Sequence, residues 1–318
     1  MVLVGGYMAL AGRSDARVGR LRELLCTVTA LFVGCSGARL IDTPLETTRI
    51  PYQFAGYTLE LYTATPSGDA QRLPILLLLE GDGGGCQAYS PKLWQRYLQR
   101  MTGHYTLVRP RNLVNAMCET PDWGRLDFLH RRAELAVQVA ALRQVWPARP
   151  LVLLGHSAGA HLAMLYAADE PDEIAAIVNL SGGVDALDQV ILALYPQGMA
   201  RRRAVDWIER MRANRSSDEP GDSRSPRFFA QMLDLPVGPL WRAYSGPLLL
   251  LHGERDDAVP ASLVRKGMAE LAKRPNLHAR IEPAWDHDLL YRTAVYAEID
   301  AWLTAVVLAD PSKPVHGQ

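Results

Sequence analysis

The chain has 318 residues, of which 48% are hydrophobic and 21% are charged. This is the composition of an ordinary globular protein, and it excludes collagen-like and low-complexity chains. Because 34 basic side chains balance 34 acidic ones, the basic surplus typical of a nucleic-acid binder is missing, and we expect no nucleic-acid partner. The sequence has no HExxH, no CxxC and no Cys/His cluster with zinc-ligand spacing, so we predict no metal site.

The first 35 residues predict an export segment, with the remaining residues 36–318 as the folded domain. Four arginines precede an apolar run over 24–33, and Gly34 and Cys35 follow it. This is the layout of a secretory signal, and the run is too short to span a bilayer. Residues 32–35 also resemble the lipobox of bacterial lipoproteins, although Phe32 replaces the usual Leu. The resemblance implies a lipid on Cys35 and an exported protein whose one membrane contact is that anchor. The alternative is a buried segment of a cytoplasmic protein.

From residue 58 onwards, strand patterns alternate with helix patterns. The expected strands are apolar or alternate apolar and polar residues, and they cover 58–65, 73–79, 105–109, 151–154, 174–180, 247–251 and 278–282. The expected helices cover 91–101, 126–145, 160–168, 262–273 and 289–307. This alternation predicts an α/β fold with a mostly parallel sheet that helices cover on both faces.

Two segments carry further expectations. The helix over 126–145 should bury one apolar face, formed by Leu129, Ala133, Leu135, Val137, Ala140, Leu142 and Val145. The segment 184–244 interrupts the alternation with helix-like stretches but no convincing strand. Since it follows a strand, we predict a small helical cap over the carboxyl edge of the sheet, where open α/β sheets bind ligands. We interpret the arginines at 201–203 as a solvated face of this cap, and not as a phosphate or membrane site.

The strongest chemical signal is the pentapeptide GHSAG at 155–159, which lies between a buried strand and a helix. This context is typical of a nucleophile elbow, a turn so sharp that only small residues fit beside the serine. The turn lifts the serine hydroxyl above the sheet at the N-terminus of the helix. We therefore predict that Ser157 is a nucleophile.

With this motif, residues 50–310 resemble the α/β-hydrolase family, in which the acid and the base follow the serine along the chain. The segment LHGERDDAVP at 251–260 matches the family's HGxxDxxVP loop, which implies Asp256 as the acid. Asp257 and Asp185 are the alternatives. His287 precedes the final helix, where the family places its base. The other histidines considered lie in a strand, at variable motif positions, on the elbow helix or upstream of the serine: His278, His156, His252, His161, His104 and His130.

The resemblance also implies an oxyanion hole, in which backbone N–H groups stabilise the tetrahedral intermediate of acyl transfer. One donor is the N–H of Ala158, and the other is that of Asp82, with Gly83 as the second choice. Asp82 and Gly83 lie in the loop EGDGGG at 80–85, which has Glu80 where the family usually has His. This loop resembles that of a subset of exported bacterial hydrolases. A phosphate-binding loop is disfavoured because both glycine motifs for phosphate are absent and two carboxylates would repel the ligand.

After export, Cys26 would leave with the signal and Cys35 would carry the lipid, so Cys86 and Cys118 would remain as the two unmodified cysteines. We hypothesise that they form a disulfide that anchors the oxyanion loop, because the compartment is oxidising and Cys86 follows directly on a flexible glycine run. The alternative is two unpaired thiols in separate loops.

The resemblance implies a serine hydrolase that cleaves an ester, or alternatively an amide, of a small acyl substrate through an acyl-enzyme. It implies no cofactor. Rival functions are an acyltransferase, a serine peptidase of the prolyl-oligopeptidase type and a non-catalytic binding protein on the same scaffold. The sequence indicates no oligomeric state. Several aromatic residues are candidates for an acyl pocket and equally for the core: Tyr89, Trp94, Phe228, Phe229 and Trp285.

Overall fold

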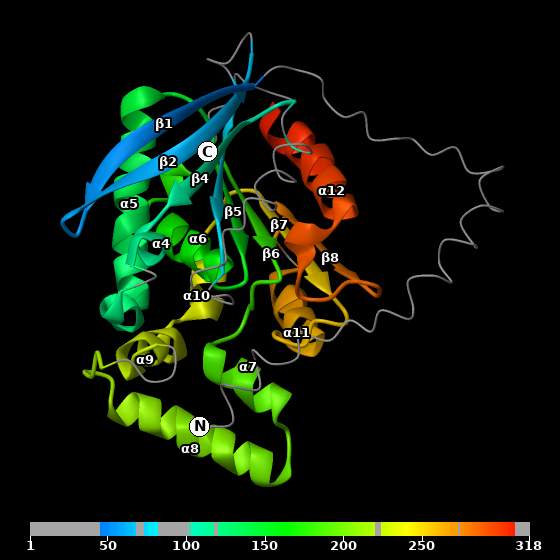
Figure 1. Cartoon of the computed structure of the whole chain (residues 1–318). Helices are drawn as coiled ribbons and strands as arrows, with labels where there is room; N and C mark the ends of the chain where they lie inside the picture. Colours follow the sequence, from blue (N-terminus) through cyan, green and yellow to red (C-terminus); the bar gives the residue numbers. More distant parts are fainter. Residues whose placement is uncertain are drawn as a thin grey trace, which may run out of the picture. The chain divides into compact units, whose positions relative to one another are not determined.

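The structure is a computed structural model that describes residues 45–67, 73–81, 101, 103–117, 120–219, 224–272 and 274–308. All of these belong to one compact unit, Ile41–Gln318. The described residues form an eight-stranded sheet in the order β1-β2-β4-β3-β5-β6-β7-β8 (Figure 1). Its strands are β1 (Leu45–Phe54), β2 (Tyr57–Pro66), β3 (Ile75–Leu79), β4 (Thr106–Arg111), β5 (Leu151–His156), β6 (Ala176–Leu180), β7 (Leu248–Gly253) and β8 (Leu277–Glu282).

Strands β3 to β8 run parallel to one another. The hairpin β1–β2 adds two strands at one edge, where β2 pairs antiparallel with both β1 and β4. Parallel strands are buried on both faces, which explains why β3 is a continuous apolar run of five buried residues. Its side chains alternate between two hydrophobic clusters, with Leu77 and Leu79 on one face and Leu76 and Leu78 on the other. The predicted α/β fold with a mostly parallel sheet is confirmed.

Strand β1 is the one described strand that the sequence patterns did not indicate. It pairs along its whole length with β2, but most of its side chains are exposed, and Pro51 lies within it. An edge strand with little buried surface lacks the apolar pattern from which strands are predicted.

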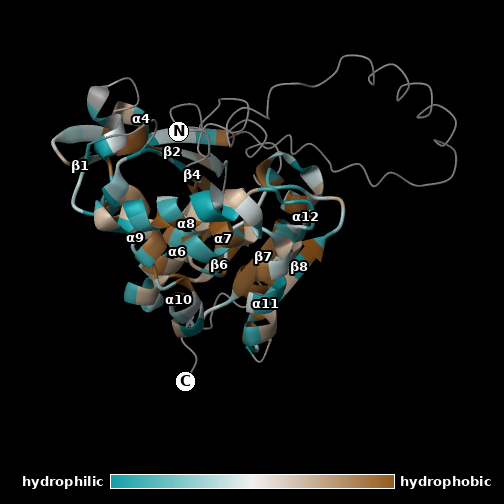
Figure 2. Ribbon diagram, turned by 90° about the horizontal axis from the view of Figure 1, so that it is seen from below, coloured by the Kyte–Doolittle hydropathy of each residue, from teal (hydrophilic) through white to brown (hydrophobic). Residues whose placement is uncertain are grey.

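Helices cover both faces of the sheet, as predicted. Helices α5, α6 and α11 pack on one face, and α12 packs on the other. The helical elements outside 184–244 are α4 (Leu113–Met117), η4 (Pro121–Arg125), α5 (Phe128–Val145), α6 (Ala158–Asp169), η5 (Pro171–Glu173), α11 (Ala261–Leu271), η6 (Leu289–Tyr291), α12 (Thr293–Leu303) and η7 (Thr304–Leu308). The helix predicted over 91–101 lies outside the described residues, apart from Met101. Figure 2 shows hydrophobic residues (brown) gathered in the central strands and hydrophilic ones (teal) on the outer faces of helices.

The segment 184–244 is helical, and its described residues contain no strand. It comprises α7 (Leu187–Leu194), α8 (Gly198–Ala213), α9 (Pro226–Asp234) and α10 (Val237–Ala243). Helix α9 contacts α5, and α10 contacts α6, whereas α7 and α8 contact each other and α9. The arginines at 201–203 are exposed, in agreement with a solvated face. The role of these helices as a cap stays a prediction.

The apolar face predicted for α5 is partly wrong. Leu129 and Val145 are 50% and 48% exposed, whereas Arg131, Glu134 and Gln138 are buried. These three polar side chains have hydrogen-bond partners inside the protein, so their burial does not leave them unsatisfied. The apolar spacing misplaced the buried face because it assumes that charged side chains point to solvent. Among the described residues, no helix is long and apolar enough to cross a membrane.

Candidate active site

Ser157 occupies a strained turn between β5 and α6. Its φ of 54° and ψ of −123° lie outside the regions that side-chain-bearing residues usually adopt, and such strain costs about 1–3 kcal/mol. The glycines on either side are sterically required. A Cβ on Gly155 would lie 2.5 Å from Cα of Ala160, and one on Gly159 would collide with the carbonyl of Leu79. The local geometry is that of the predicted elbow.

The end of β3 lies directly against this turn. A Cβ on Gly81 would lie 2.8 Å from Cβ of Ser157 and 3.3 Å from its Oγ. The peptide between Glu80 and Gly81 therefore forms one wall beside the serine hydroxyl. This close approach leaves no room for a side chain at Gly81, the first glycine of the loop.

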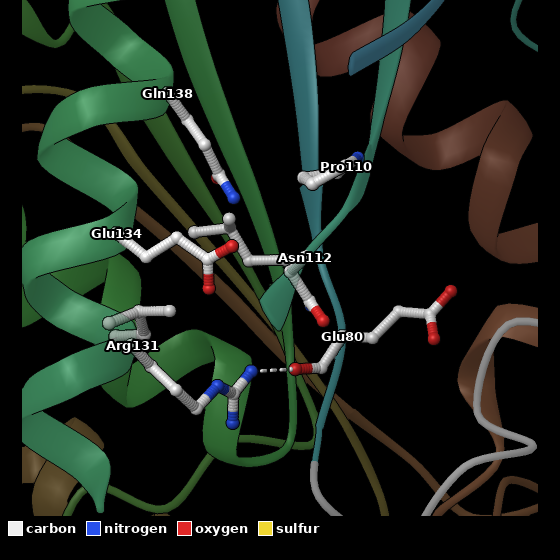
Figure 3. Close-up of a pocket in the computed structure, with 8 residues that line it drawn as sticks. Glu80, Pro110, Asn112, Arg131, Glu134 and Gln138 are labelled. Atoms are coloured by element: carbon white, nitrogen blue, oxygen red, sulfur yellow. Dashed lines mark hydrogen bonds between the residues drawn. The ribbon is translucent and has the colours of Figure 1, made fainter. Parts of the chain in front are cut away.

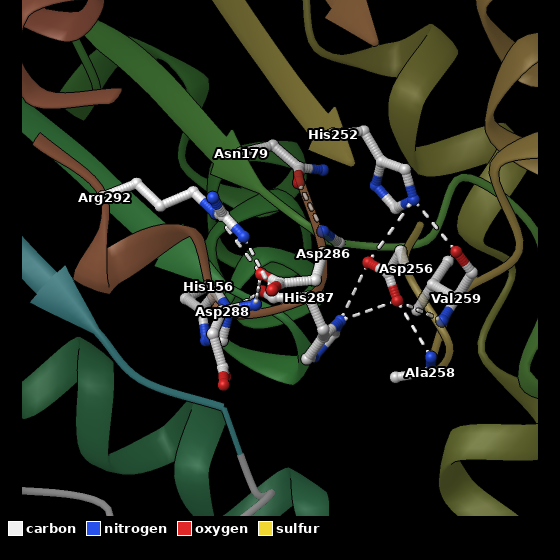
Figure 4. A network of polar contacts seen from close by, with 11 residues as sticks. His156, Asn179, His252, Asp256, Ala258, Val259, Asp286, His287, Asp288 and Arg292 are labelled. Carbon is white, nitrogen blue, oxygen red and sulfur yellow. Dashed lines mark hydrogen bonds and ion pairs between the residues drawn. The ribbon is translucent and has the colours of Figure 1, made fainter. Parts of the chain in front are cut away.

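Asp256 and His287 are brought together from two loops on the carboxyl side of β7 and β8. The Nδ1 atom of His287 is 3.0 Å from Oδ1 and 2.9 Å from Oδ2 of Asp256 (Figure 4). Because a carboxylate accepts, Nδ1 carries the proton, and the lone pair of the imidazole is on Nε2. The side chain of Asp256 is fully buried, and that of His287 is 19% exposed.

The loop around Asp256 holds its carboxylate in place. Oδ1 accepts the backbone N–H groups of Ala258 at 2.9 Å and Val259 at 2.7 Å. His252 is fully buried beside it, with Nε2 donating to the carbonyl of Val259 at 2.9 Å and lying 3.4 Å from Oδ2 of Asp256. His252, which the sequence placed at a variable motif position, therefore closes the loop that carries the acid.

His156 reaches the opposite loop. Its Nε2 donates to the backbone carbonyl of His287 at 2.9 Å, and the two rings lie 5.1 Å apart between centroids (Figure 4). Burial and the positive charge of His287 lower the pKa of His156 to about 4, so its ring is neutral at pH 7. His156 precedes Ser157, and its contact couples the elbow to the loop of His287. Among the described residues, no hydrogen bond joins the hydroxyl of Ser157 to His287. Such contacts are often long before substrate binds.

The charges around His287 favour its protonated form. Burial alone would lower its pKa, but the hydrogen bond and negative charge of Asp256, together with the charges of Asp288 and Asp257, outweigh burial and raise it. Burial would raise the pKa of Asp256, whereas the hydrogen bond and charge of His287 hold it below its ordinary value. The pair is thus an ionised carboxylate that stabilises an imidazolium, which is the arrangement that a general base needs.

The alternative acids do not share this arrangement. Asp257 influences His287 through its charge, whereas Nδ1 of His287 donates to both carboxylate oxygens of Asp256. In the part of the chain that the structure describes, Asp185 makes no hydrogen bond to His287, and its buried Oδ2 has no partner. His161 is buried on α6 and donates to the carbonyl of Gly183.

The oxyanion side is described as far as Gly81. Ala158 is the first residue of α6, so its N–H has no carbonyl partner within that helix. Burial raises the pKa of Glu80 to about 9, against the nearby charges of Arg109 and Arg131, so its carboxyl is protonated at pH 7. The expected electrostatic repulsion of phosphate by Glu80 is therefore not supported. The predicted donors Asp82 and Gly83 lie outside the described residues, as do Cys35, Cys86 and Cys118.

The structure describes three of the five aromatic residues that the sequence offered for an acyl pocket, and it places them in or against the hydrophobic core. Phe228 and Trp285 are buried in the two hydrophobic clusters, and Phe229 packs partly buried against the first of them. Tyr89 and Trp94 lie outside the described residues. In the described part of the chain, no group of His, Cys, Asp or Glu side chains could hold a metal ion.

A model of the protein family described as "Serine aminopeptidase, S33" matches residues 127–293, which is more than half of the chain. The chain belongs to this family of serine hydrolases. The matched region contains Ser157, Asp256 and His287. A comparison with curated proteins found no match.

Solved structures of α/β-hydrolases are similar to this serine hydrolase in fold. A thermostable carboxyl esterase from Bacillus coagulans has 15% identity and a TM-score of 0.62, with 83% of this chain and 99% of that chain covered. Est1E from Butyrivibrio proteoclasticus, solved with ferulic acid bound, has 16% identity and a TM-score of 0.59, with 82% and 99% covered. An acylaminoacyl peptidase from Pyrococcus horikoshii has 13% identity and a TM-score of 0.56, with 83% of this chain but 42% of that chain covered. At these identities the likeness shows the α/β-hydrolase fold.

Proposed function

We propose that this serine hydrolase is a carboxylesterase that forms an acyl-enzyme on Ser157, with His287 as general base and Asp256 as the acid that orients it. The observation that carries the proposal is the pair of hydrogen bonds from Nδ1 of His287 to the buried carboxylate of Asp256. That pair is linked to the strained Ser157 turn through His156.

The proposed reaction follows from the proton positions. With Nδ1 bound to Asp256, Nε2 of His287 takes the proton of Ser157 while Oγ forms a bond to the ester carbonyl carbon. The oxygen of the tetrahedral intermediate is stabilised by the N–H of Ala158 and by the predicted donor after Gly81. Nε2 then gives its proton to the leaving alcohol oxygen as the ester C–O bond breaks. In the second half of the reaction, water attacks the acyl-enzyme while Nε2 of His287 takes its proton. The carboxylic acid product leaves as that proton returns to Oγ of Ser157.

An ester is favoured as the substrate because the esterases similar in fold are covered over 99% of their length. The family description names an aminopeptidase, so an aminoacyl or peptide amide is the second candidate. The fold relative that is named a peptidase is more than twice as long as the part that this chain covers. An acyltransferase would use the same residues and would differ in passing the acyl group to an alcohol or amine.

The test compares Ser157→Ala with Ser181→Ala on a panel of p-nitrophenyl acyl esters and aminoacyl p-nitroanilides. Ser181 is a matched control, because it also ends a parallel strand with a positive φ of 52° and is fully buried. We expect Ser157→Ala to abolish ester cleavage and fluorophosphonate labelling, and Ser181→Ala to retain both. Faster cleavage of the anilides than of every ester would replace the esterase assignment with a peptidase, and labelling that survives Ser157→Ala would contradict the nucleophile.

We also propose that the protein is exported and carries a lipid on Cys35, and that Cys86 and Cys118 form a disulfide beside the oxyanion loop. The support is the order of basic, apolar and small residues in the first 35 positions. Mass spectrometry of the natively expressed protein should find an acylated Cys35 peptide and no alkylation of Cys86 or Cys118 without reduction. An unprocessed N-terminus contradicts export, and two free thiols contradict the disulfide.

A further inference from the structure

Helix α5 places a buried cation beneath the end of β3. The Nη2 atom of Arg131 donates to the backbone carbonyl of Glu80 at 2.7 Å, and Arg131 is 7% exposed. Figure 3 shows that the carbonyl of Glu80 faces the guanidinium, whereas its carboxyl group points away. Burying a guanidinium is unfavourable unless hydrogen bonds compensate for its lost hydration, so its place beneath this carbonyl calls for a specific explanation.

The carbonyl that Arg131 holds belongs to the peptide that lies against Ser157. On the serine side, a Cβ on Gly81 would lie 2.8 Å from Cβ of Ser157, and one on Gly159 would lie 2.8 Å from the carbonyl oxygen of Glu80. Because the peptide group is planar, fixing its carbonyl fixes its N–H and the direction in which the chain leaves β3. The elbow thus bounds the Glu80–Gly81 peptide on one side, and Arg131 holds it on the other.

The neighbours of Arg131 on α5 hold the helix in the right position for this contact. Glu134 accepts the hydroxyl of Tyr52 at 2.8 Å and the N–H of Leu113 at 2.7 Å, and Gln138 donates to the same hydroxyl at 2.9 Å. Arg131, Glu134 and Gln138 line one small cavity with Glu80 (Figure 3). These bonds join α5 to β1 and α4, so the helix that carries the guanidinium is itself fixed.

We propose that Arg131 is a positioning residue for hydrolysis, which holds the Glu80–Gly81 peptide in place beside Ser157 through the Glu80 carbonyl. The inference rests on the proposed role of Ser157 as nucleophile. Arg131 does not touch the reacting atoms, and its contribution is the rigidity of the wall that faces them. Loss of this contact lowers kcat more than it raises KM, because a misplacement of about 1 Å near the reacting atoms can cost about 100-fold in rate.

The experiment compares Arg131→Met and Arg131→Lys with Arg132→Met, using p-nitrophenyl esters and kcat per active site titrated with a fluorophosphonate. Arg132 is the matched control, because it is the next residue of α5 and pairs with Asp169 at the surface. We expect kcat to fall about 10- to 100-fold in Arg131→Met, with KM within about threefold of wild type. Arg131→Lys, which keeps a cationic donor, should retain more of the rate, and Arg132→Met should match wild type.

Normalising kcat to titrated sites separates positioning from folding, since a merely structural loss lowers the number of sites and not the rate per site. If Arg131→Met does not fold, Arg131→Lys decides by the same measure. Unchanged kcat per site in the Arg131 variants that fold, or an equal loss in Arg132→Met, overturns the proposal. Ser157→Ala in the same assay separates the two claims: activity retained there contradicts the proposed function, whereas an inactive Ser157→Ala beside fully active Arg131 variants contradicts this inference alone.

Discussion

The two sides of Ser157 are built in different ways. On the acid–base side, Asp256 is held by backbone N–H groups two and three residues further along the chain, and its partner His287 comes from the adjacent loop. On the β3 side, the Glu80 carbonyl is held by the side chain of Arg131, 51 residues away. One side is therefore organised by local loop geometry and the other by a long-range contact between a helix and the sheet.

The two sides also differ in charge. The hydrogen bond and charge of His287 lower the pKa of Asp256, and the hydrogen bond and charge of Asp256 raise the pKa of His287 above its ordinary value. Glu80, with a pKa of about 9, and His156, with a pKa of about 4, are both neutral at pH 7. We expect the pH dependence of catalysis to come from the acid–base side, whereas changes near β3 alter the rate without altering its pH profile.

The largest expected effect comes from removing the acid. Asp256→Asn should lower kcat about 10⁴-fold, the size of loss seen when the same change is made in another Ser-His-Asp enzyme, because Asn disturbs the imidazole tautomer. Asp257→Asn is the matched control and should lower kcat by less than about threefold, since it loses one distant charge and no hydrogen bond. Steady-state kinetics on one ester measure both. A crippled Asp257→Asn beside an active Asp256→Asn would mean that the acid is misassigned.

A smaller loss is expected from closing the space on the β3 side. Gly81→Ala places a Cβ 2.8 Å from Cβ of Ser157 and 3.1 Å from the carbonyl of His156, so the peptide must move away from the serine. We expect kcat to fall about 100-fold with the pH profile unchanged. Gly238→Ala, whose Cβ would meet the flexible end of Arg242 at 3.3 Å, is the control and should behave as wild type. A Gly81→Ala enzyme with full kcat would refute the close approach.

The contact between His156 and His287 should contribute less. His156→Phe removes one of the two N–H groups that bind the carbonyl of His287 and leaves the N–H of Leu289 as its remaining partner. The loss is that of a single hydrogen bond, about 0.5–1.5 kcal/mol. We expect kcat to fall about 2- to 10-fold at constant KM. His278→Phe, at a histidine whose side chain is 55% exposed, should leave kcat unchanged. Equal kinetics in the two variants would show that the elbow and the base loop are not coupled through His156.

The smallest effect is a shift in pH dependence. The base acts when it is neutral, so kcat/KM should be lost as the pH falls through the pKa of His287, which lies above the ordinary value of about 6.5. Asp256→Asn removes the negative charge that raises this pKa, and the residual activity should persist to lower pH. Arg131→Met is the comparison from the β3 side and should keep the wild-type midpoint. If the midpoint of the pH profile moves in Arg131→Met but not in Asp256→Asn, the charge of Asp256 is not what raises the pKa of His287.

The sequence predicted the parallel sheet and the elbow because both depend on local patterns, whereas Asp256 and His287 were implied by the resemblance to the α/β-hydrolase family. Strand runs are continuous in the sequence, and the glycines of the elbow are required by steric fit over a few positions. The sequence did not predict the contacts of His156 and His252, although both lie within motifs. His156 binds the carbonyl of His287, which is 131 residues away. His252 binds the carbonyl of Val259 at the far end of its own loop.

Periodicity failed on α5 for a related reason. The apolar pattern placed Leu129 and Val145 in the core, although both are about half exposed, because it counts every charged residue as solvent-facing. Arg131 and Glu134 are buried because β1, α4 and the end of β3 supply partners for them. No pattern within α5 carries that information. The roles of Asp82, Gly83 and the three cysteines stay predictions.

The most direct test of the central claim is to trap the acyl-enzyme. Wild-type protein would be mixed with a p-nitrophenyl ester, quenched in acid within the first turnover, digested and analysed by mass spectrometry, with Ser157→Ala treated in parallel. The proposed mechanism predicts the mass of the acyl group on the peptide that contains Ser157 and none in the variant. An acyl group on another residue, or ester cleavage with no acylated peptide at any quench time, would contradict it.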